Sequence, residues 1–186
     1  MVYLPPVRRL TVEDYHRMGA TGILSEDERV ELLDGELYEM TPIGDGHIGG
    51  VIGLDYFLNL RLAGRAFVSA QNPIQLNDYS EPEPDIAILR LRADNYRTGK
   101  ARPEDILMLA EVSESSLEYD RYTKLPRYAL SGIAEVWIVN LIDQVIEVYC
   151  DPQGQNYTTH TIHQRGETIH PLAFPDVSIK VEEILG

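Results

Sequence analysis

The chain has 186 residues, of which 44% are hydrophobic and 25% are charged, a composition typical of a folded globular protein and not of a disordered one. This length fits one domain, so we expect a single domain over residues 1–186. The formal net charge of −14 argues against indiscriminate nucleic-acid binding, because neutralising phosphates usually requires an excess of lysine and arginine.

The single cysteine, Cys150, excludes an intramolecular disulfide, and no apolar stretch approaches the roughly 20 residues needed to cross a bilayer. The N-terminus also lacks the basic, apolar and small-residue order of a secretory signal. We therefore expect a cytoplasmic protein that has no membrane partner.

The apolar periodicities predict helices and short strands in alternation. Thr11 before an acidic first turn is typical of a helix N-cap, and Asp34-Gly35 is typical of a two-residue hairpin turn, because both central positions favour positive φ. Pro126 leaves two alternatives for the third helical segment, which either starts near Thr123 or kinks at the proline. In chain order we expect helix 11–20, strands 30–33 and 36–40, helix 47–62, strands 66–70, 74–77, 85–89 and 106–112, helical segment 115–131, strands 135–141, 145–149 and 157–163, and helix 181–185.

Two acidic residues lie where buried strands should be apolar. Asp85 opens the run that ends at Leu89, and Glu111 interrupts the run from Ile106 to Val112. Burying a carboxylate costs several kcal/mol unless it is paired, hydrogen-bonded or bound to a cation. Two such acids on neighbouring strands therefore predict a divalent-cation site.

The residues that follow Glu111 extend this site. Residues two apart on a strand share a face, so Glu111 and Ser113 point together while Val112 points into the core and still offers its carbonyl. Mg²⁺ prefers oxygen ligands and keeps several waters, so Asp85, Glu111 and the Val112 carbonyl would leave room for a phosphate and a nucleophilic water.

Lysine is scarce, and Lys124 is the one lysine near these acids in the sequence. On a helix, Asp120 and Lys124 would share a face, so the carboxylate could orient the ammonium. An ammonium beside the metal could position water or stabilise the transition-state phosphate.

Each of these residues also has a structural explanation that the sequence leaves open. Asp85 after Pro84 could be a turn residue, and Asp120 with Lys124 could be a surface ion pair. Glu31 could be an outward residue of an exposed hairpin, or a third acid that assists a second metal or the water.

Substrate-binding candidates lie outside the acidic set. A short basic segment could steer a polyanion towards the acidic body, and His47, at the start of a predicted helix, could touch substrate or remain structural. The basic segment contains Arg90, Arg92, Arg97, Lys100 and Arg102.

A longer pattern joins these residues. The segments VELLDGELYEMTP from Val30, EPEPD ending at Asp85 and AEVSESSLEYDRYTKLPRYALSGIAEVWIVNL from Ala110, together with His47, resemble the Uma-type putative restriction endonucleases, a former domain-of-unknown-function family of the PD-(D/E)XK nuclease superfamily. The resemblance covers nearly the whole chain.

This resemblance implies a restriction-endonuclease-like α/β (α+β) fold with a central mixed sheet, an N-terminal hairpin and flanking helices. It also implies a homodimer and Mg²⁺- or Mn²⁺-dependent hydrolysis of DNA. Asp85 and Glu111 match the motif acids, and Glu31 matches an early acidic position. Where the superfamily usually has lysine this chain has Ser113, so the resemblance maps the lysine onto Lys124.

Three function classes remain open at this level. The first is a Mg²⁺-dependent endodeoxyribonuclease with Asp85 and Glu111 on the metal, Glu31 assisting and Lys124 on the phosphate. The second is a catalytically silent interaction module that keeps the fold. The third is a metal-dependent hydrolase of a small phosphoester, which the acidic body would tolerate better than DNA.

Overall fold

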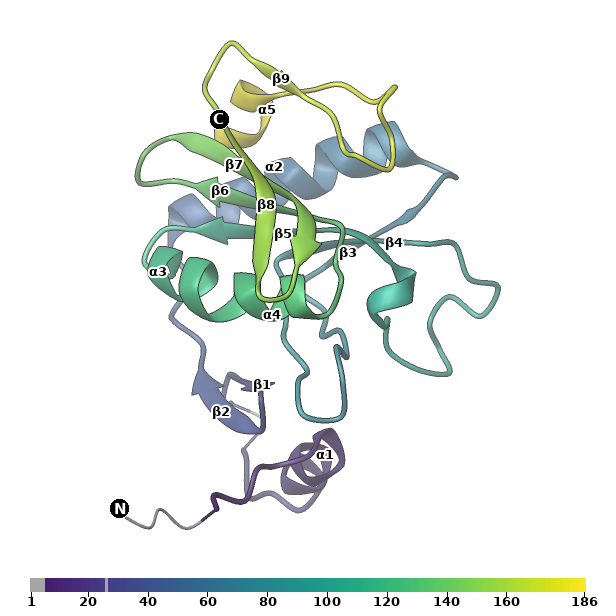
Figure 1. Cartoon of the computed structure of the whole chain (residues 1–186), viewed down its shortest axis with the longest axis vertical. Coiled ribbons are helices and arrows are strands. Elements are labelled where there is room, and N and C mark those ends of the chain that lie inside the picture. Colours follow the sequence, from purple (N-terminus) through teal and green to yellow (C-terminus); the bar gives the residue numbers. More distant parts are fainter. Residues whose placement is uncertain (1–5, 26) are drawn as a thin grey trace.

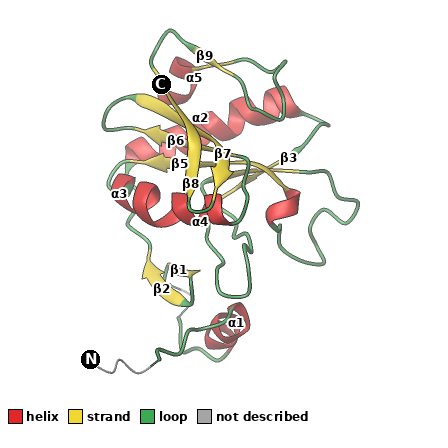
Figure 2. Ribbon diagram, in the orientation of Figure 1, coloured by secondary structure: helices red, strands yellow, loops and turns green. Residues whose placement is uncertain are grey.

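The structure is a computed structural model that describes residues 6–25 and 27–186. A central mixed sheet of six strands is covered on both faces by helices (Figures 1 and 2). The strands follow the order β3-β4-β5-β6-β7-β8, with β5 and β6 parallel and the other neighbours antiparallel. Their bounds are β3 (Phe67–Ala70), β4 (Ile86–Leu89), β5 (Ile106–Ser113), β6 (Glu135–Asn140), β7 (Val145–Gln153) and β8 (Asn156–His163). The predicted mixed sheet with flanking helices is therefore confirmed.

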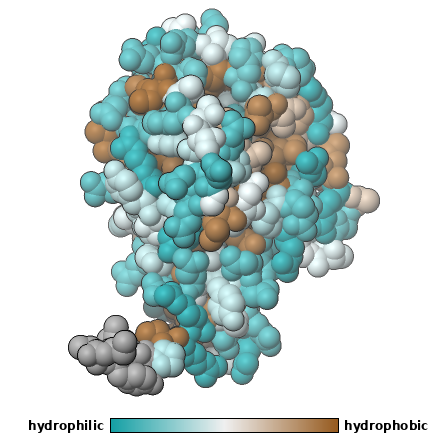
Figure 3. Space-filling model, viewed as in Figure 1, coloured by the Kyte–Doolittle hydropathy of each residue, from teal (hydrophilic) through white to brown (hydrophobic). Residues whose placement is uncertain are grey.

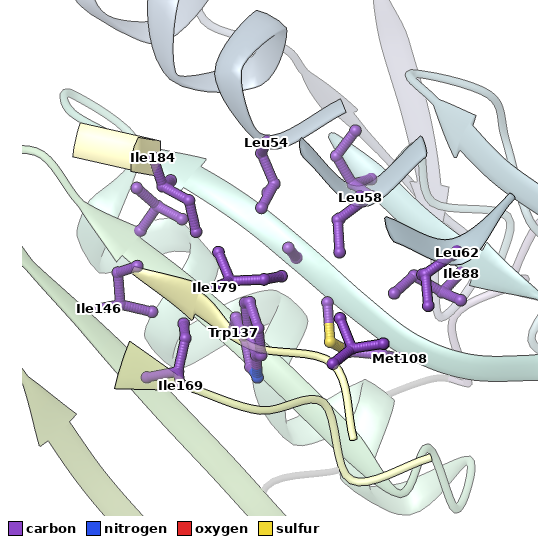
Figure 4. Packing of buried hydrophobic residues seen from close by; sticks show 14 of the residues in the cluster. Leu54, Leu58, Leu62, Ile88, Met108, Trp137, Ile146, Ile169, Ile179 and Ile184 are labelled. Carbon is purple, nitrogen blue, oxygen red and sulfur yellow. The ribbon is translucent and has the colours of Figure 1, made fainter. Parts of the chain in front are cut away.

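One face of the sheet carries the longest helix. α2 (Asp45–Leu62) packs there together with α5 (Val181–Leu185) and the small ribbon β9 (Thr168–Ile169) and β10 (Ile179–Lys180). In Figure 4, Leu54, Leu58 and Leu62 of α2 point towards the sheet residues Trp137, Met108 and Ile88. Fully burying each such leucine contributes roughly 1.5–3 kcal/mol, so this face holds the main core.

The opposite face is covered by one helical segment of three parts: α3 (Leu117–Tyr119), a π-helical turn η2 (Asp120–Lys124) and α4 (Leu125–Leu130). Its fully buried side chain Tyr128 packs with Leu109 and Val136 of the sheet. Within the described residues, no helix is both long and apolar enough to cross a membrane.

The N-terminal part lies beside this second layer, at the lower end of Figure 1. It contains α1 (Val12–Ala20) and the hairpin of β1 (Val30–Leu33) and β2 (Glu36–Glu39); a 3₁₀ turn, η1 (Pro103–Asp105), precedes β5. Thr11 caps α1, and Asp34 and Gly35 adopt the positive φ values of 49° and 77° that a tight hairpin turn needs. On the side seen in Figure 3, the surface is mainly hydrophilic with small separate apolar groups.

One local prediction is corrected by the structure, and one alternative that the sequence left open is decided. Residues 74–77 form no strand, because the chain they face contains Pro82 and Pro84, which have no amide hydrogen for a continuous ladder. The helical segment 115–131 starts at Leu117 and not near Thr123. It accommodates Pro126 with the π-helical turn, in which the Leu125 amide donates to the Asp120 carbonyl.

Candidate metal and phosphodiester site

Asp85 and Glu111 meet because β4 and β5 are antiparallel neighbours. Asp85 directly precedes β4, and Glu111 lies near the end of β5. The Val112 amide donates a 2.8 Å hydrogen bond to Asp85 Oδ2, and the Asp85 amide donates a longer one of 3.4 Å to Glu111 Oε2. Val112 itself points into the core, as the strand alternation predicts. The two carboxylates therefore lie on one side of the sheet, at one end of both strands.

Lys124 reaches these acids from the π-helical turn. Its Nζ lies 3.3 Å from Glu111 Oε1 and 3.4 Å from Glu31 Oε1. All three side chains are almost completely buried. Burial alone would lower the pKa of Lys124, but Glu111 and Glu31 reverse this effect and raise it above its ordinary value. The ammonium is therefore charged at neutral pH and joins an acid of the hairpin to an acid of the central sheet.

Two tyrosines hold the acids on either side of Lys124. The Tyr119 hydroxyl donates to Glu31 Oε1 at 2.8 Å, and the Tyr128 hydroxyl donates to Glu111 Oε1 at 2.5 Å. Burial raises the pKa of Glu111 well above its usual range, against the opposing effect of Lys124. Neither tyrosine is among the site residues predicted from sequence, because aromatic side chains occur at many helical positions and a spacing of five residues before and four after Lys124 is not specific.

Asp120 does not hold Lys124. Its Oδ2 accepts hydrogen bonds of 2.7 Å from both Ser113 and Ser116, and within the described chain Lys124 makes ion pairs with Glu31 and Glu111 instead. The expected direct pairing of Asp120 with Lys124 is corrected, because the Asp120 carboxylate is held by the two serine hydroxyls. Asp120 favours the charged ammonium only from beyond ion-pair distance. The Ser113 hydroxyl thus fixes Asp120, and burial raises the pKa of that carboxyl.

His47, from the first turn of α2, lies between Asp85 and Val112. Its Nδ1 donates a 2.8 Å hydrogen bond to the Val112 carbonyl, and its Nε2 lies 3.0 Å from Asp85 Oδ1 without the alignment of a hydrogen bond. The neighbouring Asp85 carboxylate raises the pKa of His47, while burial opposes the shift. His47 is thus anchored against the two acidic strands.

A cavity of about 220 Å³ joins these groups. It is lined by Glu31, Glu39, Glu83, Asp85, Glu111 and Asp120, six carboxylic acids, and by the two permanent cations Arg29 and Lys124. Arg29, Glu83 and Gln71 were not singled out from sequence; the Gln71 amide Nε2 donates to Asp85 Oδ1 at 3.3 Å. A larger hollow of about 660 Å³ beside α1 contains none of the site residues predicted from sequence.

The basic segment does not reach this cavity. Arg90 follows the far end of β4, about 16 Å from Asp85 at 3.3 Å per residue. Arg92 pairs with Asp94, and Lys100 pairs with the buried Glu81. None of Arg90, Arg92, Arg97, Lys100 and Arg102 lines the cavity. That this segment steers a polyanion towards the acidic body stays a prediction.

The donor set fits a hard divalent cation. Six acids facing two permanent cations leave the cavity with excess negative charge, and Asp85, Glu111 and the Val112 carbonyl offer oxygen ligands. His47 Nε2 lies 3.0 Å from Asp85 Oδ1, so the imidazole occupies one side of that carboxylate. In the described ranges, no group of three or more His, Cys, Asp and Glu side chains is arranged to hold a metal ion.

Comparison with known proteins places the chain in a family. The family model described as Uma2, putative restriction endonuclease, matches residues 12–182. The fold is similar to the crystal structure of a putative nuclease belonging to DUF820 from Anabaena variabilis ATCC 29413. The TM-score is 0.74 and the identity 13%, over 95% of this chain and 97% of that one. Comparison with curated proteins finds no match. Because the family model spans nearly all of its length, this chain belongs to the Uma2 family of putative restriction endonucleases.

Proposed function

We propose that the protein is a Mg²⁺-dependent endodeoxyribonuclease that hydrolyses phosphodiester bonds of DNA, with Mn²⁺ as an alternative cation. The observation that carries this proposal is the convergence of Glu31, Asp85, Glu111 and Lys124 from four separate elements into one acidic cavity. Family membership and the nuclease-like fold support the class of reaction.

In this proposal Asp85, Glu111 and the Val112 carbonyl hold the cation. The carbonyl oxygen has a second lone pair besides the one that accepts from His47, so both interactions are compatible. When bound, the metal would lower the pKa of a water and neutralise charge that develops on the phosphate.

The side chains around the metal ligands have separate tasks. Lys124, held in its charged form by Glu31 and Glu111, presents an ammonium to the phosphate oxygens. Glu31 holds that ammonium in place through an ion pair. Asp120 accepts a hydrogen bond from Ser113 of β5, which ties the helical segment that carries Lys124 to the sheet. His47 orients Asp85 and contacts the substrate at the cavity wall.

A plasmid-cleavage assay tests the proposal. Purified protein with Mg²⁺ should convert supercoiled plasmid to nicked or linear forms, and Asp85→Asn and Lys124→Met should each lower the rate at least 100-fold. Asp176→Asn, which changes a surface carboxylate paired with Arg65, should cut like the wild type. Cleavage that survives Asp85→Asn would refute the proposed site.

A second candidate is hydrolysis of a small phosphoester, which an acidic chain would tolerate better than DNA. The basic segment lies away from the cavity, and the chain carries −14 overall. Salt separates the two candidates, because counterion release makes DNA binding fall steeply between 50 and 200 mM salt. Turnover of bis(p-nitrophenyl) phosphate that is insensitive to salt, without plasmid cleavage, would favour the small substrate.

A further inference from the structure

A second hollow, of about 450 Å³, lies where the β7–β8 hairpin meets the helical segment that contains α4 (Figure 1). It shares no lining residue with the acidic cavity. Its lining includes the rings of Tyr122, Tyr149 and His160, and Pro126 and Ile162 add apolar surface. Small-molecule sites usually measure about 300–1,000 Å³ and combine an apolar, aromatic lining with a few fixed polar groups. The hollow therefore has the size and the lining of a ligand site.

The guanidinium of Arg121 in this hollow is fixed by a buried carboxylate. Its Nε and Nη2 donate side by side to the two oxygens of Glu147, which is 2% exposed. Tyr149 and Asn140 also donate to these oxygens, so the acceptor positions of Glu147 are filled. A guanidinium has five N–H donors in a rigid plane, and Glu147 takes two of them. Within the described part of the chain no acceptor takes the other three, so the outer edge of the guanidinium is free.

Aromatic rings line the hollow together with this guanidinium. The His160 imidazole stacks on the Tyr149 ring, with 4.2 Å between the ring centroids and 4° between the planes. Tyr122 directly follows Arg121 and is 74% exposed, so its ring is available to solvent. Bases stack on exposed aromatic side chains of this kind. The hollow thus combines a stacking surface with a fixed edge of parallel N–H donors.

The charge of the hollow favours an uncharged ligand. Burial alone would raise the pKa of Glu147, but its hydrogen bonds lower it, so its negative charge cancels the positive charge of Arg121. An anion therefore gains little net attraction here, and it approaches a chain that carries −14. A flat, uncharged ring with two adjacent acceptors fits the free guanidinium edge. Guanine offers such a pair in O6 and N7, whereas adenine has an amino group in place of O6.

We propose that this hollow binds a guanine ring, in the form of an uncharged nucleoside, which stacks on Tyr122 and accepts hydrogen bonds from the free edge of Arg121 at O6 and N7. The site is separate from the acidic cavity, although Arg121 and Lys124 belong to the same π-helical turn. A nucleoside contains no phosphodiester bond, so its binding does not rest on the proposed function.

Equilibrium dialysis of the full chain against nucleosides tests which acceptors are recognised. Guanosine and inosine, which share O6 and N7, should each bind about 10-fold or more tightly than adenosine. Guanosine 5′-monophosphate should bind no more tightly than guanosine, because the pair of Arg121 and Glu147 carries no net charge. Three results would overturn the proposal: no binding of guanosine up to its solubility, equal binding of adenosine, or tighter binding of the monophosphate.

Two substitutions test where the nucleoside binds. Tyr122→Ala removes the exposed ring and should weaken guanosine binding about 5-fold or more. Tyr56→Ala is the matched control, because Tyr56 is 59% exposed on α2, and guanosine binding should be unchanged. Arg121→Lys keeps a cation beside Glu147 but loses the planar fork, so the preference for guanosine over adenosine should disappear. Unchanged guanosine affinity in Tyr122→Ala, or an unchanged preference in Arg121→Lys, would overturn the proposal.

Discussion

Lys124 Nζ lies 3.3 Å from Glu111 Oε1, and both side chains are buried at the point where the π-helical turn crosses the central sheet. Glu31 completes the cluster from the hairpin at 3.4 Å. One ammonium thus compensates two carboxylates that come from distant parts of the chain. The cluster both positions the candidate site and connects the hairpin to the sheet.

Removing the ammonium should destabilise the protein strongly. Lys124→Met leaves Glu31 and Glu111 buried without their cation, and breaking a buried pair in this way typically costs about 3–5 kcal/mol. Urea unfolding measures this loss. Adding Glu111→Gln should recover part of it, because one uncompensated charge is removed. Strictly additive losses in the double variant would show that the two side chains are not coupled.

Tyr128→Phe should lower the free energy of unfolding, because Glu111 loses the hydrogen bond from the tyrosine hydroxyl. The variant deletes one buried hydrogen bond to a carboxylate, which is worth about 1.5–3 kcal/mol, against about 0.5–1.5 kcal/mol for a bond between neutral groups. Tyr157→Phe is the matched control, because the Tyr157 hydroxyl donates to the neutral carbonyl of Ile133 at 2.8 Å. Unfolding free energies should fall more for Tyr128→Phe, and equal losses would contradict a charged Glu111.

Gly50 should be intolerant of a side chain. A Cβ at this position would lie 2.7 Å from Val112 Cγ1, so Gly50→Ala should push α2 away from β5 and cost about 1–3 kcal/mol. A Cβ at the neighbouring Gly49 meets nothing within 4 Å, so Gly49→Ala should gain about 0.5–1 kcal/mol from helix propensity. Thermal unfolding compares the two. A harmless Gly50→Ala would mean that α2 packs less closely.

Stability should depend on pH through Glu147. Burial alone would raise the pKa of Glu147, but hydrogen bonds from Arg121, Tyr149 and Asn140 outweigh it and lower the pKa. A lowered folded-state pKa contributes stability above the unfolded value of about 4.3, and this contribution disappears as pH falls through the folded value. Glu147→Gln should therefore cost about 1–3 kcal/mol at pH 7 and progressively less below pH 4.3.

The control for this experiment is the exposed Glu118. Glu118→Gln should change the unfolding free energy little at either pH. If the difference between wild type and Glu147→Gln stayed constant from pH 7 to pH 3, the ion pair with Arg121 would not be the source of the stability.

Local signals explain which parts of the fold were predictable. The Thr11 cap, the Asp34-Gly35 turn and the terminal helix Val181–Leu185 depend on neighbouring residues, and the structure has all three. Residues 74–77 read as a strand because their own side chains favour one. The segment that they face contains Pro82 and Pro84, and a pattern of neighbouring residues does not show what a strand would pair with.

The residues of the candidate site also fall into those that the sequence indicates and those that it does not. Burying an acid in an apolar run is costly in any fold, so Asp85 and Glu111 could be picked out before their partners were known. Tyr119, Tyr128 and Arg29 could not be identified in this way, because aromatic and arginine side chains are common at many positions. The π-helical turn itself has no simple sequence signal, and neither has the pairing of Asp120 with Ser113 and Ser116 in place of Lys124.

Crystals soaked in Mn²⁺ and measured at the manganese absorption edge test the central claim most directly. We predict an anomalous peak bonded to the Asp85 and Glu111 carboxylates and the Val112 carbonyl, which disappears in Asp85→Asn crystals. A fully soaked wild-type crystal with no peak in this cavity, or with its peak at another cluster, would contradict it.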